Sequence, residues 1–177
     1  ISYGTEQLKQ RGSRMKPLGI RMLCSLQMAV GSGELRLTSS DPNVQPFLDY
    51  QYLENDFDRQ RMREMVRTAV SLADTDRFKA IIEERVEPTD AELATDEELD
   101  EYLLRKASTS QHISCTCKMG PASDPMAVVD QYGRVHGLDG LRVADASILP
   151  DCPRGNTNVP AMLIGERVAD FIRKSAS

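Results

Sequence analysis

The chain has 177 residues, of which 40% are hydrophobic, and it carries a formal net charge of −5 at pH 7. This length suffices for a domain with a buried core, and no apolar run approaches the ~20 residues that cross a membrane. The 22 basic residues are scattered among 27 acidic ones, which argues against a nucleic-acid partner. We therefore expect a soluble, globular protein with no membrane span and no nucleic-acid ligand.

The cysteines favour packing over metal binding. Cys115 and Cys117 alternate along an expected strand, so they should point to opposite faces and cannot easily bind one metal ion together. With only two histidines and no Cys-x-x-Cys pair, no metal site is predicted. We expect reduced cysteines in a cytoplasmic protein, since the sequence shows no signal peptide or transit segment. The start at Ile1, in mid-pattern, suggests a fragment or a processed chain.

The first third of the chain has the pattern of short strands. Residues 1–19 are polar and rich in glycine, which indicates a surface loop. Residues 20–30 form a β-like apolar run. Polar and apolar residues alternate over 34–38, as in a half-buried antiparallel strand, and the aromatic-rich segment 46–53 predicts another.

Two helices are predicted next. The first begins near Asp56 or Asp58, either of which can cap it. Its apolar positions recur with helical spacing and comprise Met62, Met65, Val66, Ala69, Val70 and Ala73. We interpret the methionines as core residues. A shorter helix is expected over about 75–84.

The segment 87–101 is strongly acidic. It could serve as an acidic binding tail, but Thr95 and Glu98 have the spacing of a capping box ahead of apolar residues. A solvated helix is the better interpretation.

Near the C-terminus, three pieces follow one another. Leu141–Ala144 is an apolar run typical of a buried strand, and 151–159 contains prolines, a glycine and asparagines that predict an irregular turn. From Pro160 the apolar spacing is helical. A strand, a polar turn and a helix N-terminus form the geometry with which α/β folds bind anionic or electron-rich ligands.

Several short sequence words accompany this segment in a fixed order. They are His112 to Gly120 (HISCTCKMG), Arg134-Val135-His136-Gly137, Gly140 to Ser147, Asn156-Thr157-Asn158-Val159-Pro160 and Gly165-Glu166. The series closely resembles the C-terminal signature of the glucose–methanol–choline (GMC) family of flavoprotein oxidoreductases. The resemblance extends from about Gly31 to Arg173, nearly the whole chain.

The resemblance implies a fold in two parts. Residues 1–120 would form an α+β substrate-binding domain with an antiparallel sheet. Residues 121–177 would supply the strand and helix that complete an α/β, Rossmann-like FAD-binding domain. No Gly-x-Gly-x-x-Gly follows a strand in the sequence, so we expect an N-terminal FAD-binding portion, in the same protein or a separate chain, to hold the pyrophosphate.

His112 is the first candidate catalytic residue. A lone histidine is usually a half-buried structural residue, but by resemblance His112 lies over the flavin and acts as base toward the substrate alcohol. The family usually has glycine where this chain has Cys115, so the backbone or pocket beside His112 is expected to differ. His136 is interpreted as a structural residue in a turn.

Asn156 is the second candidate, and by resemblance it orients the substrate oxygen, although asparagine is equally common in turns and helix caps. Thr157 and Asn158 would face the pyrimidine edge of the flavin, where reduction places negative charge. Asp145 and Ala146 would contact the ribityl and phosphate part of FAD. The alternative for Asp145 is a turn-forming residue.

These assignments predict the C-terminal half of an FAD-dependent oxidoreductase. It would oxidise a CH–OH group of a primary or secondary alcohol by hydride transfer to flavin N5, with His112 as base. Two alternatives remain: an FAD-containing lyase of the hydroxynitrile-lyase kind, and a non-catalytic interaction fragment. The sequence leaves open the substrate, the electron acceptor and whether the protein forms a homo-oligomer.

Overall fold

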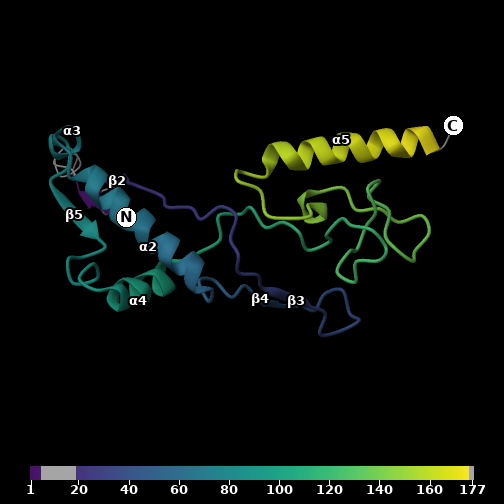
Figure 1. The fold of residues 1–177 in the computed structure, drawn as a ribbon, viewed down its shortest axis with the longest axis horizontal. Helices are drawn as coiled ribbons and strands as arrows, with labels where there is room; N and C mark the ends of the chain where they lie inside the picture. Colours follow the sequence, from purple (N-terminus) through teal and green to yellow (C-terminus); the bar gives the residue numbers. More distant parts are fainter. Residues whose placement is uncertain (5–18, 176–177) are drawn as a thin grey trace. The chain divides into compact units, whose positions relative to one another are not determined.

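The computed structural model describes residues 1–4 and 19–175 and divides into two compact units. Unit 1 comprises Ile1–Leu26, Val30–Glu34 and Phe47–Ser108. Unit 2 comprises Gln27–Ala29, Leu35–Pro46 and Thr109–Ser177. Figure 1 shows the course of the chain through both units. The predicted assignment of 1–120 to a substrate domain and 121–177 to an FAD domain refers to the domains of a complete FAD enzyme. It stays a prediction.

The main helix of unit 1 is α2 (Asp56–Ala73), as the apolar spacing predicted. Its cap differs from the prediction, because the side chain of Asn55 accepts a hydrogen bond from the Phe57 backbone N–H at 3.0 Å. Asp58 instead lies buried and accepts hydrogen bonds from the backbone N–H groups of Val30 and Gly31 at 2.8 and 2.7 Å. Asp58, which was predicted as a possible cap, therefore binds the segment at Val30 and Gly31 to α2.

The acidic segment ends in α4 (Asp96–Lys106), which confirms the helix prediction. The hydroxyl of Thr95 accepts from the Glu98 backbone N–H at 3.2 Å, the cap that its spacing indicated. Arg63 of α2 donates to both carboxylate oxygens of Asp100 at 2.8 Å, so the two helices are joined by an ion pair as well as by packing.

The second predicted helix is much shorter than expected. α3 spans Asp76–Lys79, and β5 (Glu84–Glu87) follows where the end of the helix was predicted. β5 pairs antiparallel with β1 (Ser2–Gly4), which pairs antiparallel with β2 (Ile20–Arg21) on its other side. The predicted loop over 1–19 therefore begins with a strand, and its residues 5–18 lie outside the described residues. Together these strands form the small antiparallel sheet of an α+β fold.

The other two predicted strands exist in shortened form. β3 (Glu34–Arg36) and β4 (Phe47–Asp49) make a two-stranded sheet, and all of β3 is exposed rather than half-buried. A Cβ on Gly33 would lie 2.2 Å from the Asp49 carbonyl oxygen, so only glycine allows this approach. The apolar run 20–30 is mostly irregular, with a strand only at Ile20–Arg21.

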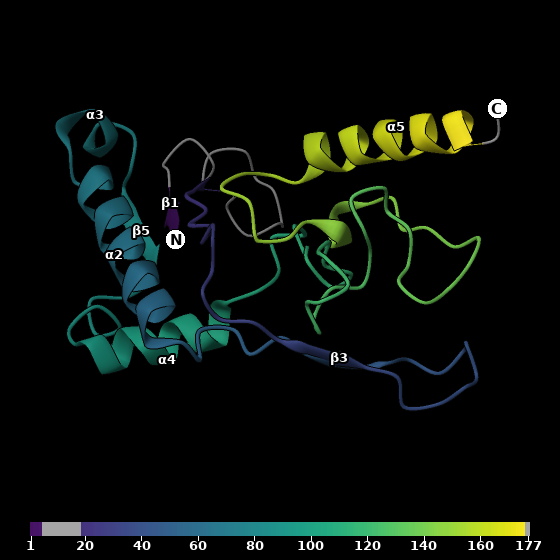
Figure 2. The same ribbon diagram turned by 45° about the vertical axis from the view of Figure 1, so that its right-hand side comes forward.

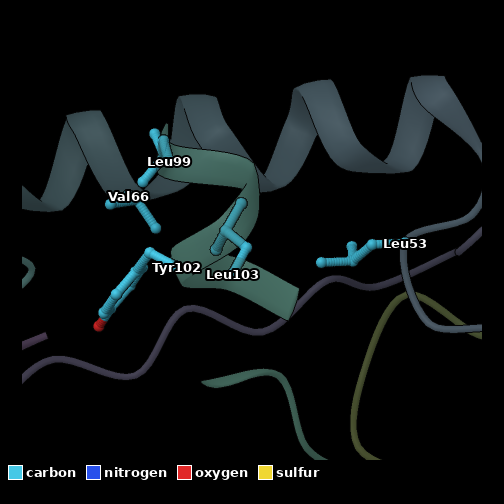
Figure 3. Packing of buried hydrophobic residues seen from close by; sticks show 5 residues of the cluster. All are labelled: Leu53, Val66, Leu99, Tyr102 and Leu103. Atoms are coloured by element: carbon cyan, nitrogen blue, oxygen red, sulfur yellow. The ribbon is translucent and has the colours of Figure 1, made fainter. Parts of the chain in front are cut away.

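The core of unit 1 lies where α2 and α4 cross (Figure 3). Val66 of α2 packs with Leu99, Tyr102 and Leu103 of α4, and Leu53 completes the cluster. Burial raises the pKa of Tyr102 to about 12, with a smaller contribution from nearby carboxylates. Burial of these apolar side chains holds the helix pair together.

Unit 2 is built around α5 (Asn158–Ser175), which confirms the predicted C-terminal helix. α5 lies beside the irregular segment that contains the short 3-10 helix η1 (Ala146–Ile148), as the views in Figures 1 and 2 agree. The predicted buried strand at Leu141–Ala144 is wrong for this structure, because Leu141 is exposed and Arg142 makes only an isolated bridge with Arg134. Two backbone hydrogen bonds join this segment to Gly133–Val135, from the Val135 N–H to the Leu141 carbonyl at 3.1 Å and from the Val143 N–H to the Gly133 carbonyl at 2.9 Å. They make a single bridge, which is shorter than a strand.

Turns shape the rest of unit 2. Gly133 has φ +73°, and a Cβ there would lie 2.6 Å from the Val143 carbonyl oxygen, so this close approach requires glycine. His136 lies in a turn, as predicted, with its Nε2 3.0 Å from the Gly120 carbonyl oxygen. Among the helices in the described part of the chain, none is both long and apolar enough to cross a membrane.

Candidate active site

His112 lies in an irregular segment of unit 2 rather than in the strand that the sequence predicted. The turn before it places Gln111 at φ 63°, with the Gln111 backbone N–H donating to the Thr109 hydroxyl at 2.9 Å. The imidazole is half-buried. His112 therefore follows directly after a turn that the Thr109 side chain stabilises.

The segment after His112 runs along η1. Alternate backbone N–H groups, those of Cys115, Cys117 and Met119, donate to the successive carbonyls of Ala146, Ser147 and Ile148. Every second residue donates, as the alternation of Cys115 and Cys117 along a strand predicted, although no regular strand forms. These hydrogen bonds bring the predicted cofactor residue Ala146 alongside the chain that carries His112.

His112 meets the turn before α5 through Thr157. Its Nδ1 lies 3.2 Å from the Thr157 hydroxyl oxygen and 3.5 Å from the Thr157 backbone nitrogen. Thr157 is buried, with 8% of its surface exposed. Its carbonyl accepts from the Ala161 N–H at 2.9 Å, which makes Thr157 the residue that caps α5.

Asn156 and Asn158 flank this contact, and both are exposed. The structure thus brings together two of the predicted site segments, one with His112 and one with the Asn156–Asn158 turn, through Thr157. The predicted roles of these residues toward substrate and flavin remain predictions.

Asp145 occupies the turn that begins η1. One of its carboxylate oxygens accepts from the Ser147 backbone N–H at 2.8 Å, and the residue is exposed. This is the turn-forming role that the sequence offered as the alternative. The role does not exclude a contact with a cofactor, because a carboxylate has lone pairs for several donors.

Cys115 has φ +72°, in the left-handed region that favours glycine. A change in backbone or pocket was predicted at this position, and the structure shows a backbone conformation that glycine adopts most readily. Burial raises the pKa of the Cys115 thiol, which donates to the Ser114 hydroxyl at 3.3 Å. A higher pKa leaves less of the reactive thiolate at a given pH.

The contact between His112 and Thr157 was not predicted. Thr157 was assigned to the flavin by resemblance, and nothing in the order of residues shows that its hydroxyl turns to a histidine 45 positions earlier. The sequence does contain one signal, which is Pro160 in the first turn of α5. A capping threonine hydroxyl often accepts a hydrogen bond from the backbone N–H of the third helical residue, and Pro160 has no N–H to donate.

The start of α5 has the chemistry needed beside a flavin ring. The N–H groups of Asn158 and Val159 belong to the first helical turn and have no carbonyl four residues back within the helix. Both residues are exposed, and the positive end of the helix dipole adds to their donors. This donor set fits the electron-rich pyrimidine edge of FAD.

Comparison with known proteins identifies the family. Residues 29–165 match the C-terminal profile of the family described as GMC oxidoreductase. The chain belongs to this family. The family predicted from the sequence words around His112 and Asn156 is thereby confirmed.

The related GMC proteins include bacterial choline dehydrogenases. The chain is 40% identical over 145 residues to oxygen-dependent choline dehydrogenase 1 of Chromohalobacter salexigens, covering 82% of this chain and 26% of that protein. It is 43% identical over 145 residues to the oxygen-dependent choline dehydrogenase of Burkholderia thailandensis, covering 80% and 25%. The chain thus spans about a quarter of the length of these relatives.

Solved GMC-like structures resemble the fold closely. A formate oxidase superposes with a TM-score of 0.73 at 33% identity, over 81% of this chain and 25% of its own. A fungal aryl-alcohol oxidase gives 0.68 at 35% identity, over 81% and 23%. An FAD-dependent oxidoreductase from Chaetomium thermophilum gives 0.72 at 29% identity, over 81% and 25%.

Proposed function

We propose that the chain is the C-terminal part of an FAD-dependent enzyme that oxidises a CH–OH group, with His112 as the base. The observation that carries the proposal is the meeting of His112 with the turn before α5, through Thr157. Family membership supports it, and so do the names of the relatives, which include choline dehydrogenases and an aryl-alcohol oxidase.

Two residues of this chain would act on the hydroxyl group of the alcohol, His112 as the base and Asn156 as the residue that orients the oxygen. His112 takes the hydroxyl proton of the alcohol on its Nε2, because a neutral imidazole can accept a proton near neutral pH. The amide of Asn156 hydrogen-bonds the alcohol oxygen and orients it, since an amide cannot act as a base. When bound, FAD supplies the hydride acceptor, flavin N5.

Loss of the hydroxyl proton helps the hydride to leave, because the electron pair on the oxygen then forms the carbonyl bond. The backbone donors at Asn158 and Val159 would stabilise negative charge at the pyrimidine edge. Asp145 and Ala146 would lie near the ribityl and phosphate part of FAD. The exposure of the Asp145 carboxylate supports this placement.

The remainder of the FAD site would come from an N-terminal FAD-binding portion, in the same protein or a separate chain. Residues 1–120 would then serve as the substrate-binding domain, and 121–177 would complete the Rossmann-like FAD-binding domain. The chain covers 26% and 25% of the two choline dehydrogenases, which supports a longer protein in which other segments hold the rest of FAD. Their names favour a primary alcohol as substrate. A cytoplasmic location stays a prediction.

The test uses the protein assembled with its FAD-binding portion. After anaerobic mixing with an alcohol such as choline, flavin absorbance should bleach in the wild type. In His112→Ala the bleaching should be about 10²–10⁴-fold slower, the usual contribution of a general base. The matched control is His136→Ala, which removes the other histidine of the chain, whose ring faces the Gly120 carbonyl.

Three outcomes would contradict the proposal. Undiminished bleaching in His112→Ala removes the base assignment. Turnover of a cyanohydrin without bleaching would show a lyase that keeps FAD as structure. Absence of flavin colour after assembly would show a non-catalytic interaction fragment.

A further inference from the structure

We propose that Cys115 and Cys152 form a redox-modification site beside the candidate active site. Both are free thiols, and each is half-buried, so that a small oxidant can reach them. A peroxide joins them in a reversible disulfide, which slows the reduction of the flavin. The disulfide depends on the two cysteines alone, whereas its effect on the rate rests on the proposed function of His112 and Asn156.

Two contacts in unit 2 fix the ends of two neighbouring segments. The Met119 N–H donates to the Ile148 carbonyl at 2.9 Å. Nδ1 of His112 lies 3.2 Å from the Thr157 hydroxyl oxygen. The chain therefore leaves Ile148 beside Met119 and reaches Thr157 beside His112. Between these two points it runs back along the segment that follows His112, in the opposite direction.

The two cysteines lie near the middle of these facing segments. Cys152 belongs to the returning segment 149–156, and Cys115 belongs to the facing segment 113–118. The electrostatics agree with this path, because burial raises the pKa of the Cys115 thiol and the neighbouring Cys152 and Asp151 raise it further. A neighbouring ionisable group shifts a pKa in this way only at close range. The two thiols are therefore neighbours.

The backbone at Cys115 also supports a role for its side chain. Its φ of +72° lies in the left-handed region, where a residue with a Cβ is held at a cost in stability. Glycine would avoid that cost. Strained residues of this kind cluster at sites where the side chain acts, and a thiol that pairs with a second thiol is such an action.

The oxidation balances with one molecule of hydrogen peroxide. The thiolate of one cysteine attacks a peroxide oxygen, so that an S–O bond forms, the O–O bond breaks and hydroxide leaves. The thiolate of the other cysteine then attacks the sulfur of this sulfenic acid, so that the S–S bond forms, the S–O bond breaks and a second hydroxide leaves. The two hydroxides take up the two thiol protons and become water. The sulfurs have then given two electrons to the peroxide.

The disulfide joins the two segments that carry the proposed catalytic residues. Cys115 lies three residues after His112, and Cys152 lies four residues before Asn156. Bonded sulfurs are ~2.05 Å apart, which is closer than two separate thiols can approach, so the bond displaces at least one of the segments. A displacement of ~1 Å can slow an enzymatic reaction by about 10²-fold. Oxidation therefore slows flavin reduction.

The test uses the protein assembled with its FAD-binding portion. After brief treatment with hydrogen peroxide, free thiols are alkylated, and the protein is digested and analysed by mass spectrometry without a reductant. We expect a pair of peptides joined through Cys115 and Cys152, two hydrogens lighter than the separate peptides and released by dithiothreitol. Cys152→Ser should abolish this pair. The matched control is Cys24→Ser, which removes another half-buried free thiol and should leave the pair intact.

The second readout is the rate at which an alcohol reduces the flavin without oxygen. Peroxide treatment should slow this step at least about tenfold in the wild type and in Cys24→Ser, and dithiothreitol should restore it. Methionine sulfoxide, the other common product of peroxide, is not reversed in this way. Cys152→Ser should show no comparable loss, because it cannot form the disulfide.

A wild-type protein whose Cys115 and Cys152 both stay open to alkylation after peroxide overturns the proposal, and this result needs no variant to fold. A disulfide from either of them to another cysteine, such as Cys117, also overturns it. A Cys115–Cys152 disulfide that leaves the rate unchanged overturns the claimed effect on flavin reduction. The proposed function fails separately, if His112→Ala bleaches normally whatever the state of the thiols.

Discussion

At the scale of single residues, the site depends on two side chains in unusual positions. Cys115 takes a left-handed backbone conformation three residues after His112, and Thr157 caps a helix whose first turn contains a proline. The φ of Cys115 and the position of Thr157 at the start of α5 are both properties of the backbone. The order of residues therefore revealed them only in part. From the sequence, the side chain at Cys115 predicted a change in the backbone or the pocket beside His112, and the structure shows that the backbone is in the left-handed region.

Replacing Cys115 with glycine should stabilise the protein. A non-glycine residue in the left-handed region costs about 1 kcal/mol, and glycine removes that cost, although it adds freedom to the unfolded chain. We expect the free energy of unfolding, measured with urea, to rise by up to ~1 kcal/mol. Cys117→Gly is the matched control and should lower it, because Cys117 has no positive φ. A destabilised Cys115→Gly protein would contradict this explanation.

At the scale of elements, local patterns were predicted well and distant pairings were not. α2 and the Thr95 cap of α4 follow from spacings within one helix. β5 was not predicted, because its partner β1 (Ser2–Gly4) lies far earlier in the sequence. Leu141–Ala144 has the composition of a strand, but composition cannot supply the neighbouring strands that a sheet requires.

The packing of α4 against α2 gives a prediction at this scale. Leu99 is 0% exposed within the core of unit 1, so Leu99→Ala should leave a cavity and lower the free energy of unfolding by about 2–5 kcal/mol. Leu104 lies on the same helix but is 54% exposed, so Leu104→Ala should cost under ~1 kcal/mol. Thermal unfolding of the two variants measures the difference. Equal losses would show that the α2–α4 contact is not the core.

At the scale of the whole molecule, the C-terminal helix has an unpartnered apolar stripe. Three apolar side chains lie on one face of this helix, at positions i, i+3 and i+4. They are Val159, Met162 and Leu163, which are 66%, 57% and 59% exposed. Apolar groups gathered in this way are usually covered in the complete protein. Under the proposed function, the FAD-binding portion would cover them. The family words around His112 and Asn156 sufficed to identify the family, whereas the path of the backbone around them required the structure.

The central claim is that His112 and Asn156 act on one substrate oxygen. A crystal structure of the assembled protein with FAD and a substrate-like alcohol tests it most directly. We predict His112 Nε2 and an Asn156 amide atom within ~3 Å of the alcohol oxygen, on the same face of the flavin. An imidazole and an amide that lie apart, or on opposite faces of the ring, would contradict the account.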